Sequence, residues 1–267
     1  MNAPAAIRIE EVRKTFSTGG AEVVALDGID LEVAAGEFVC LLGPSGCGKS
    51  TLLNAVAGFS PPTSGRIRVA GQPVAGPGPD RAMVFQEYAL FPWMTVAENV
   101  AFGLEVKGSP APEIRATVDT WLEKLGLSDF RDRFPKDLSG GMRQRVAIAR
   151  VLAIDPPVLL MDEPFGALDA LTRRNLQEEL LRIWSGSGKT VLFVTHGIEE
   201  AIFLADRVVV MTYRPGAVKE IVPVTLSRPR DPHSADFSTL ERRVAALVMA
   251  EQARQERDER VGVGRGA

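Results

Sequence analysis

A glycine-rich segment at residues 43–51 constrains the fold of this chain more than any other feature. It reads Gly-Pro-Ser-Gly-Cys-Gly-Lys-Ser-Thr, it follows the apolar run 38–42, and a helix-forming stretch continues to residue 57. In this order of strand, loop and helix, glycines allow backbone N–H groups to turn inward around a phosphate. The positive end of the helix dipole adds to the same place. The segment therefore predicts a phosphate-binding loop in an α/β fold.

Two side chains of this loop have the chemistry that a nucleoside triphosphate requires. Lys49 is placed to reach the β- and γ-phosphates, and the Ser50 hydroxyl is placed to ligate Mg²⁺. An ordinary glycine-rich turn is the alternative, but the flanking strand and helix argue against it. The other residues of the predicted phosphate cradle are Gly43, Pro44, Ser45, Gly46, Cys47, Gly48 and Thr51.

Composition narrows the class of protein. The 267 residues are 45% hydrophobic and 24% charged, as in an ordinary soluble globular protein. A formal net charge of −3 argues against a broad nucleic-acid-binding face. The first residues do not resemble a secretory signal, and no apolar run has the length of a membrane span. The two cysteines, Cys40 and Cys47, fit a reducing compartment and are not expected to form a disulfide.

Hydrophobic patterning predicts three kinds of segment. Alternating segments joined by glycine turns predict an antiparallel sheet with one solvent-facing side; they lie at 7–9, 23–26, 29–33 and 65–69. Continuous apolar runs predict central parallel strands covered on both faces; they lie at 158–161, 190–194 and 207–211. Apolar residues three and four apart predict helices in the segments 96–104, 112–125 and 142–154.

These patterns predict an α/β fold in which a P-loop NTPase core has a parallel central sheet, an antiparallel β subdomain and an inserted α-helical subdomain at about residues 88–156. A turn-rich connector at 225–232 precedes a last helix that is apolar on one face from Phe237 to Val248. The charged segment 251–260 is expected to fray at the end of that helix.

The apolar strand at 158–161 ends in two carboxylates, Asp162 and Glu163. Asp162 fits the aspartate that positions Mg²⁺, usually through water. Glu163 is placed where a base could polarise the attacking water. Two acids after a strand are common at protein surfaces, but a phosphate loop in the same chain favours the catalytic interpretation.

The segment Leu138-Ser-Gly-Gly-Met-Arg-Gln144 has the chemistry of a helix start. Ser139 can cap the helix, and Gly140 and Gly141 expose backbone N–H groups, so a second phosphate-facing site is predicted. If this site and the Lys49 loop lie on different subdomains, they cannot face one phosphate within a single chain, whereas two chains arranged head to tail can. A plain glycine-rich cap is the alternative for residues 139–141 taken alone.

With these motifs, the sequence resembles the ATP-binding subunits of ABC transporters. The motifs follow the family's order: the phosphate loop, Gln86, residues 138–144, Asp162-Glu163 with Asp169, and His196. The resemblance extends to about residue 230. It implies an ATP-hydrolysing domain over residues 1–230, with 231–267 as a C-terminal helix and frayed tail. It also implies ATP and Mg²⁺ as cofactors, and two copies of the chain that enclose two ATP molecules.

The resemblance also assigns roles to individual residues. Phe16 falls where the family has an aromatic ring that stacks on adenine, although a core position is the alternative for a lone phenylalanine near a strand. Gln86 matches the residue that touches Mg²⁺ and the attacking water, and that moves with the membrane partner. His196 matches the histidine that contacts the γ-phosphate. Gly197 departs from the family, which often has aspartate there, and this puts only the stiffness of the loop in doubt.

The remaining roles concern the opposite copy of the chain. Asp169 matches the loop that contacts the other subunit. Ser139, Gly140, Gly141 and Gln144 belong to the signature that faces the other subunit's nucleotide.

Segment 88–99 looks like the importer version of the region after the glutamine loop. Its Leu-Phe-Pro-Trp stretch at 90–93 and the segment 211–221, the latter together with 228–231, are similar to the ATPases of nitrate, sulfonate and taurine importers. This similarity implies import of a small oxyanion through a transmembrane permease subunit, with a substrate-binding protein involved indirectly and no nucleic acid. The homodimer would then lie peripherally on the cytoplasmic face of the inner membrane.

Segment 88–99 would form part of the groove for a coupling helix, or else a satellite core. The alternative functions are a soluble ABC-type ATPase that acts mechanically on a non-membrane partner, and the ATPase of an exporter. The sequence does not name the solute.

Overall fold

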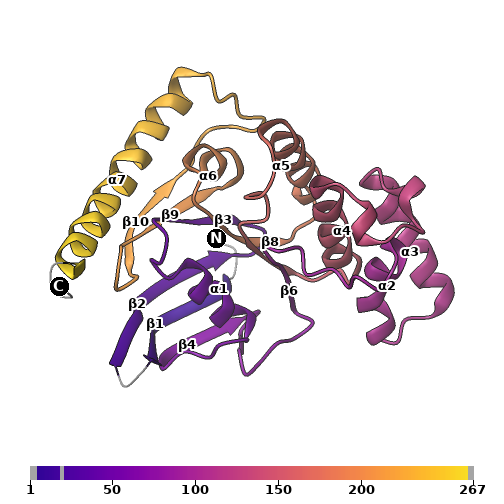
Figure 1. The fold of residues 1–267 in the computed structure, drawn as a ribbon, viewed down its shortest axis with the longest axis horizontal. Helices are drawn as coiled ribbons and strands as arrows, with labels where there is room; N and C mark the ends of the chain where they lie inside the picture. The colour runs from indigo at the N-terminus through magenta and orange to yellow at the C-terminus, as the bar shows by residue number, and fades with distance from the viewer. Residues whose placement is uncertain (1–4, 19–20, 264–267) are drawn as a thin grey trace. The chain divides into compact units, whose positions relative to one another are not determined.

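A computed structural model describes residues 5–18 and 21–263 of the chain (Figure 1). The chain divides into two compact units, which are Met1–Gly78 with Lys189–Ala267, and Pro79–Gly188. The helical subdomain that we predicted at 88–156 falls inside the second unit. Among the described helices, none is long and apolar enough to cross a membrane.

The first unit contains the predicted antiparallel sheet, in the strand order β2-β1-β4-β5. Its strands are β1 (Ala5–Thr18), β2 (Ala21–Ala34), β4 (Ser64–Val69) and β5 (Gln72–Pro73). Along β1, Ile7 and Ile9 are buried whereas Arg8 is exposed, so one face covers the core and the other faces solvent, as predicted. The two alternating runs at 23–26 and 29–33 belong to one long strand, β2.

The other sheet of the first unit contains the buried apolar runs, in the order β10-β9-β3-β8. Its strands are β3 (Phe38–Leu42), β8 (Thr190–Thr195), β9 (Arg207–Met211) and β10 (Val218–Pro223). Strand β3 runs parallel to both β8 and β9, and all residues of β3 and β8 are buried, as the continuous apolar runs predicted. Helix α1 (Lys49–Ala57) contacts β2 and β4 on the one hand and β8 on the other, so it joins the two sheets.

The second unit combines a pair of parallel strands with helices. Its strands are β6 (Arg81–Val84) and β7 (Val158–Asp162), and its α-helices are α2 (Val96–Val106), α3 (Ala111–Lys124), α4 (Gly140–Ala153) and α5 (Ala170–Trp184). Short 3₁₀ turns cover Ser128–Phe130 and Pro135–Asp137. Apolar residues of α2, α3 and α4 form a shared core, which includes Val100, Leu122 and Val146. The predicted helical periodicity of this region is therefore confirmed.

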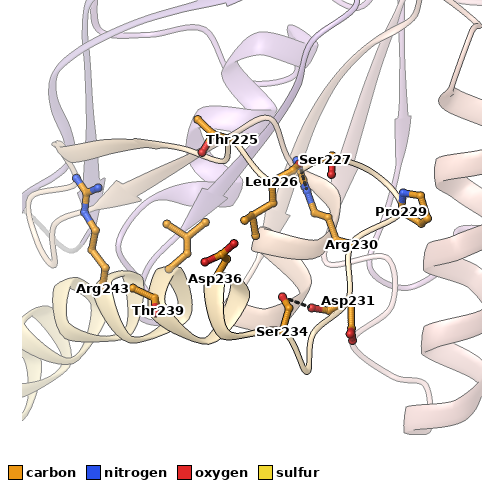
Figure 2. Close-up of a pocket in the computed structure, with 11 residues that line it drawn as sticks. Thr225, Leu226, Ser227, Pro229, Arg230, Asp231, Ser234, Asp236, Thr239 and Arg243 are labelled. Carbon is orange, nitrogen blue, oxygen red and sulfur yellow. Dashed lines mark hydrogen bonds between the residues drawn. The ribbon is translucent and has the colours of Figure 1, made fainter.

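The connector after β10 is held by a buried arginine in the first unit. The Nη1 group of Arg230 donates to the carbonyls of Ile202, Phe203 and Ala205, at 2.7, 3.1 and 2.7 Å. These carbonyls end helix α6 (Ile198–Leu204), where a helix leaves backbone acceptors without partners. Burial lowers the pKa of Arg230 to about 10. Figure 2 shows this arginine at a groove of about 730 Å³ between the connector and helix α7 (Ala235–Val263).

Helix α7 continues to Val263, so the predicted fraying of residues 251–260 is wrong. Glu251 is buried, and its carboxylate accepts the Tyr213 N–H at 2.9 Å and the Lys219 ammonium at 2.7 Å. Burial by itself raises the pKa of Glu251, but the bonds from Lys219 and Tyr213 outweigh it and the pKa is lowered. In Figure 1 the helix accordingly runs beside β10. The charged segment thus begins with an anchor to the first unit.

We expect Glu251→Gln to lower the free energy of unfolding by about 1–3 kcal/mol at neutral pH, because the Lys219 ammonium loses its buried charged partner. Since folding lowers the pKa of this carboxyl, the stabilisation is complete above the ordinary glutamate range. It disappears as the pH falls through the lowered pKa. Denaturant unfolding of both proteins between pH 4 and 8 measures the effect. Glu256→Gln, on an exposed side chain of the same helix, is the matched control and should change stability by less than about 0.5 kcal/mol. Equal stability of Glu251→Gln and wild type at pH 7 would contradict the anchor.

Candidate nucleotide site

The predicted phosphate loop connects β3 to α1 in the first unit. Gly48 caps the helix with a φ of 94°, a conformation that other residues rarely adopt. A methyl group at this position would lie 2.6 Å from the Cδ2 atom of Leu26 and 3.0 Å from the carbonyl oxygen of Ala25. The first turn of α1 has no acidic residue, so its N–H groups and its dipole favour an anion. These features fit the phosphates of a nucleotide.

Lys49 folds back over this loop. Its side chain is 6% exposed, and its ammonium donates to the carbonyls of Gly43 and Pro44 at 2.7 and 3.0 Å. Its Nζ atom is also 3.7 Å from the Sγ atom of Cys47. Burial raises the pKa of the Cys47 thiol and the lysine charge opposes this only in part, so the thiol stays neutral. Cys40 and Cys47 are both free, as predicted. The lysine charge is thus concentrated at the loop that is expected to hold phosphate.

The sheet register places His196 beside the phosphate loop. Leu42 at the end of β3 pairs with Thr195 at the end of β8, so the loop and His196 leave the same edge of the sheet. Ligands of open α/β sheets bind outside this carboxyl edge. His196 is exposed, and the Thr195 hydroxyl fixes the next turn by accepting the Gly197 N–H at 2.9 Å and bonding the Glu200 carboxylate. Gly197 has a φ of −87°, which any residue can adopt, so its departure from the family pattern does not disturb this turn.

Phe16 lies on β1 with 40% of its surface exposed. The Lys14 ammonium is 5.2 Å from the centroid of its ring. This exposure argues against the core position that was the alternative for Phe16. An exposed ring with a cation nearby fits a flat ligand with attached phosphates.

In the second unit, Gln86 and the two predicted catalytic carboxylates follow neighbouring parallel strands. Val84 pairs with Met161, so Gln86, Asp162 and Glu163 lie at one carboxyl edge. Glu163 has a φ of 43°, and the left-handed region costs a residue of this type roughly 1–3 kcal/mol. Backbone strain of this size at a strand end is characteristic of functional positions.

The loop after Glu163 is held by a residue that the sequence analysis did not identify. Arg173 donates to the carbonyls of Leu168 and Phe165, at 2.7 and 3.2 Å. Asp169 caps α5 by accepting the Thr172 N–H at 3.0 Å, and this hydrogen bond lowers the pKa of Asp169. Asp169 is exposed, as a contact to another subunit requires. In the sequence, Arg173 is marked only by its place as a basic residue in the first turn of α5.

Ser139 caps α4, as predicted. Its hydroxyl accepts the Met142 N–H at 3.3 Å, the side chain is exposed, and the first turn of α4 has no acidic residue. Gly141 is required by close packing, because a methyl group there would lie 2.7 Å from Thr172 Cγ2. Gln144 differs from Ser139: it is fully buried, and neither polar atom of its amide has a hydrogen-bond partner among the described residues. Its contact with a nucleotide therefore stays a prediction.

Two arginines of α4 tie this helix to the loop after Gln86. Arg150 donates to the carbonyls of Ala89 and Tyr88 at 2.7 and 3.2 Å, and burial lowers its pKa. Arg143 lies 5.5 Å from the centroid of the Tyr88 ring. Sequence reasoning missed both residues, although a basic residue inside the apolar pattern of α4 is a possible signal. The glutamine loop and the signature helix are therefore mechanically joined.

An aromatic patch follows this loop and consists of Phe91, Trp93 and Phe102. The Phe91 centroid lies 5.6 Å from that of Trp93 and 4.6 Å from that of Phe102. Trp93 is 69% exposed. Asn99 is fully buried and holds the backbone of the patch by bonding both the N–H and the carbonyl of Phe91. The patch is thus a rigid apolar surface rather than only a satellite core.

The family model described as ABC transporter matches residues 26–166. This chain belongs to the ABC transporter family. It is 52% identical over 223 residues to the nitrate import ATP-binding protein NrtD of Synechococcus elongatus, covering 82% of this chain and 81% of the relative. It is 51% identical over 228 residues to the bicarbonate transport ATP-binding protein CmpD of a Synechocystis species, covering 84% and 81%.

A solved structure of a dimeric ATP-binding cassette, bound to ADP and Pi after hydrolysis, matches with a TM-score of 0.74 at 33% identity. It covers 83% of this chain and 100% of that structure's chain. The P-loop NTPase fold predicted from the sequence is confirmed. The present chain, as a member of this family, is an ATP hydrolase whose cofactors are ATP and Mg²⁺.

The residues present fit these cofactors. Gly48 and the acid-free start of α1 form an anion cradle with Lys49 at its side. The Ser50 hydroxyl and the Asp162 carboxylate are hard oxygen donors of the kind that Mg²⁺ prefers. When bound, Mg²⁺ neutralises charge on the phosphates.

We expect Glu163→Gln to lower the rate of ATP hydrolysis at least about 100-fold while leaving ATP affinity nearly unchanged, because an amide cannot accept a proton from water. Phosphate release and fluorescent-nucleotide titration measure the two quantities. Glu178→Gln, an exposed carboxylate on α5, is the control and should hydrolyse ATP at the wild-type rate. Rapid hydrolysis by Glu163→Gln would show that another group is the base.

Proposed function

We propose that this chain powers import of a small oxyanion through a separate membrane subunit. The observation that carries the proposal is the identity of at least half, over more than four fifths of the chain, to relatives named for nitrate import and bicarbonate transport. Nitrate and bicarbonate are both small planar anions, and the sulfonate and taurine importers that the sequence resembles carry oxyanions as well. These names support a small oxyanion as the solute class, and uptake assays identify the individual solute.

In this function, each motif residue has one task. Lys49 binds the β- and γ-phosphates, while Ser50 and Asp162 provide the oxygen donors for Mg²⁺. Glu163 accepts a proton from the attacking water, and Gln86 orients that water. His196 contacts the γ-phosphate. The ring of Phe16 stacks on the base, which its exposure allows.

Two copies of the chain act together. The capped, acid-free start of α4 at Ser139–Gly141 presents N–H groups to the nucleotide held by the partner's phosphate loop. Asp169 contacts the opposite copy. The solved relative, which is itself a dimeric cassette, supports this arrangement. If it holds, Glu163→Gln should be a monomer without nucleotide and a dimer with ATP, but not with ADP, in size-exclusion chromatography.

The aromatic patch is the surface proposed to bind the membrane subunit. Trp93 supplies an exposed ring on a backbone fixed by Asn99, and buried aromatic anchors dominate the energy of many interfaces. Arg150 and Arg143 join the adjacent loop to α4. A movement of the permease is thereby transmitted from the patch to the signature helix. The protein would then work as a peripheral subunit on the cytoplasmic side of the membrane.

We expect Trp93→Ala to weaken binding to the permease at least about tenfold, the loss typical of an interface hot spot. ATP hydrolysis by the isolated subunit should remain at the wild-type rate. Co-purification from detergent-solubilised membranes and a hydrolysis assay measure the two effects. Phe59→Ala, which removes a 52% exposed ring in the first unit, is the matched control. Equal recovery of the permease with Trp93→Ala and wild type would place the binding surface elsewhere.

Uptake by whole cells tests the direction and the solute class. A host lacking this gene should lose uptake of at least one of labelled nitrate, bicarbonate and taurine. The wild-type gene should restore that uptake, and the Glu163→Gln gene should not. Accumulation of a solute inside the cells that lack the gene would instead favour an exporter. Unchanged uptake of all three solutes, together with binding of the chain to a soluble partner, would favour a mechanical ATPase.

A further inference from the structure

The hairpin that joins β9 to β10 lies against the phosphate loop. We call residues 212–217 the hairpin. Leu42 of β3 pairs with Val210 of β9, so the loop and the hairpin leave neighbouring parallel strands at one carboxyl edge. The hairpin and His196 therefore flank the phosphate loop on opposite sides, since β9 and β8 lie on either side of β3. His196 already has a proposed role, whereas the hairpin has none.

Gly216 makes the closest approach between the hairpin and the loop. A methyl group at Gly216 would lie 2.2 Å from the carbonyl oxygen of Cys47, so only glycine fits there. The Gly216 N–H donates to the Ala25 carbonyl at 3.0 Å, and the Gly216 carbonyl accepts the Asp27 N–H at 2.9 Å. The hairpin is thus fixed by backbone hydrogen bonds to β2 while it touches the phosphate loop.

Arg214, at the tip of the hairpin, is placed beside the middle of the phosphate loop. A methyl group at Gly46 would lie 3.2 Å from the Nη2 atom and 3.8 Å from the Cζ atom of Arg214. The guanidinium therefore contacts the loop, while the residue as a whole is exposed. The Tyr213 ring supports the cation from the hairpin side, with its centroid 5.8 Å from Cζ.

We propose that Arg214 is a nucleotide-binding residue that attracts the phosphates of ATP from the side of the loop opposite His196. The loop wraps a phosphate within a few ångströms of its backbone, so the guanidinium lies within about one Debye length, roughly 8 Å, of the bound charge. Arginine keeps its charge at any physiological pH and can donate to phosphate oxygens in a fork. The inference rests on the ATP-binding role of residues 43–51.

Glu251 of α7 is the positioning residue for this hairpin. Its carboxylate accepts the N–H of Tyr213, the residue before Arg214, at 2.9 Å, and it also holds Lys219 at the start of β10. The C-terminal helix therefore reaches the nucleotide site through two residues of the hairpin and its flanking strand. A change in α7 is expected to alter ATP affinity without any contact between α7 and ATP.

The test measures nucleotide affinity by displacement of a fluorescent ATP analogue from the purified full chain. Arg214→Gln should weaken ATP binding about three- to tenfold, ADP binding less, and AMP binding least, because the attraction grows with phosphate charge. The loss for ATP should shrink as salt rises from 50 to 500 mM, since salt screens an exposed charge. Arg214→Lys should recover most of the ATP affinity at low salt. Glu251→Gln should weaken ATP binding in the same order of nucleotides, by a smaller factor.

Arg242→Gln is the matched control, because it removes an exposed arginine of the same unit far along the chain from the hairpin. It should bind ATP like wild type. Equal ATP affinity of Arg214→Gln and wild type within twofold would overturn the proposal, and so would an equal loss for ATP and AMP, which would indicate a merely structural role. Lys49→Ala separates a failure of this proposal from a failure of the phosphate-loop assignment. Retained ATP binding in Lys49→Ala would refute the phosphate-loop assignment, whereas loss of ATP binding would support that assignment whatever the result for Arg214.

Discussion

The parallel register around β3 is the constraint on which the first unit depends. Leu42 is paired with Thr195 on one side and with Val210 on the other, and every residue of β3 is buried. A slip of one residue would move every side chain of β3 to the opposite face, so the close packing of side chains of different size on both faces favours a single register. The phosphate loop, His196 and the Arg214 hairpin consequently emerge at one edge. In the second unit, the parallel pairing of β6 with β7 likewise places Gln86 and Glu163 at one edge.

Hydrogen bonds from arginine side chains to backbone carbonyls hold several of the loops in both units. Arg230 binds the end of α6, Arg173 the loop before Asp169, and Arg150 the loop after Gln86. A guanidinium has several donors in one plane and can satisfy two or three carbonyls that no secondary structure reaches. These loops are therefore held by arginine hydrogen bonds, from buried Arg230 and from the partly buried Arg173 and Arg150, as well as by hydrophobic packing. Their rigidity explains how short polar motifs keep a fixed position at the sheet edges.

Sequence patterns sufficed for the features whose signal is local. The apolar run 38–42 and the glycines after it predicted a strand and a phosphate loop, and Ser139 was readable as a cap. Strand β10 was not predicted, because Lys219 and Glu220 interrupt its apolar pattern; these two residues pair with Glu251 and Arg243 of α7. The left-handed conformation of Glu163 was equally invisible, since no glycine or asparagine marks it. Contacts between residues distant in sequence have no local pattern to reveal them.

The buried amide of Gln144 has a consequence for protein engineering. Leaving a buried polar group without a partner costs about 1–3 kcal/mol, and Gln144 has both amide atoms in that condition among the described residues. A methionine has nearly the same length and no such atoms, so it would suit the interior of the second unit better. The wild-type glutamine is thus expected to lower the stability of the second unit. A library selected only for heat resistance would replace this position early, and its survivors would show whether transport tolerates the exchange.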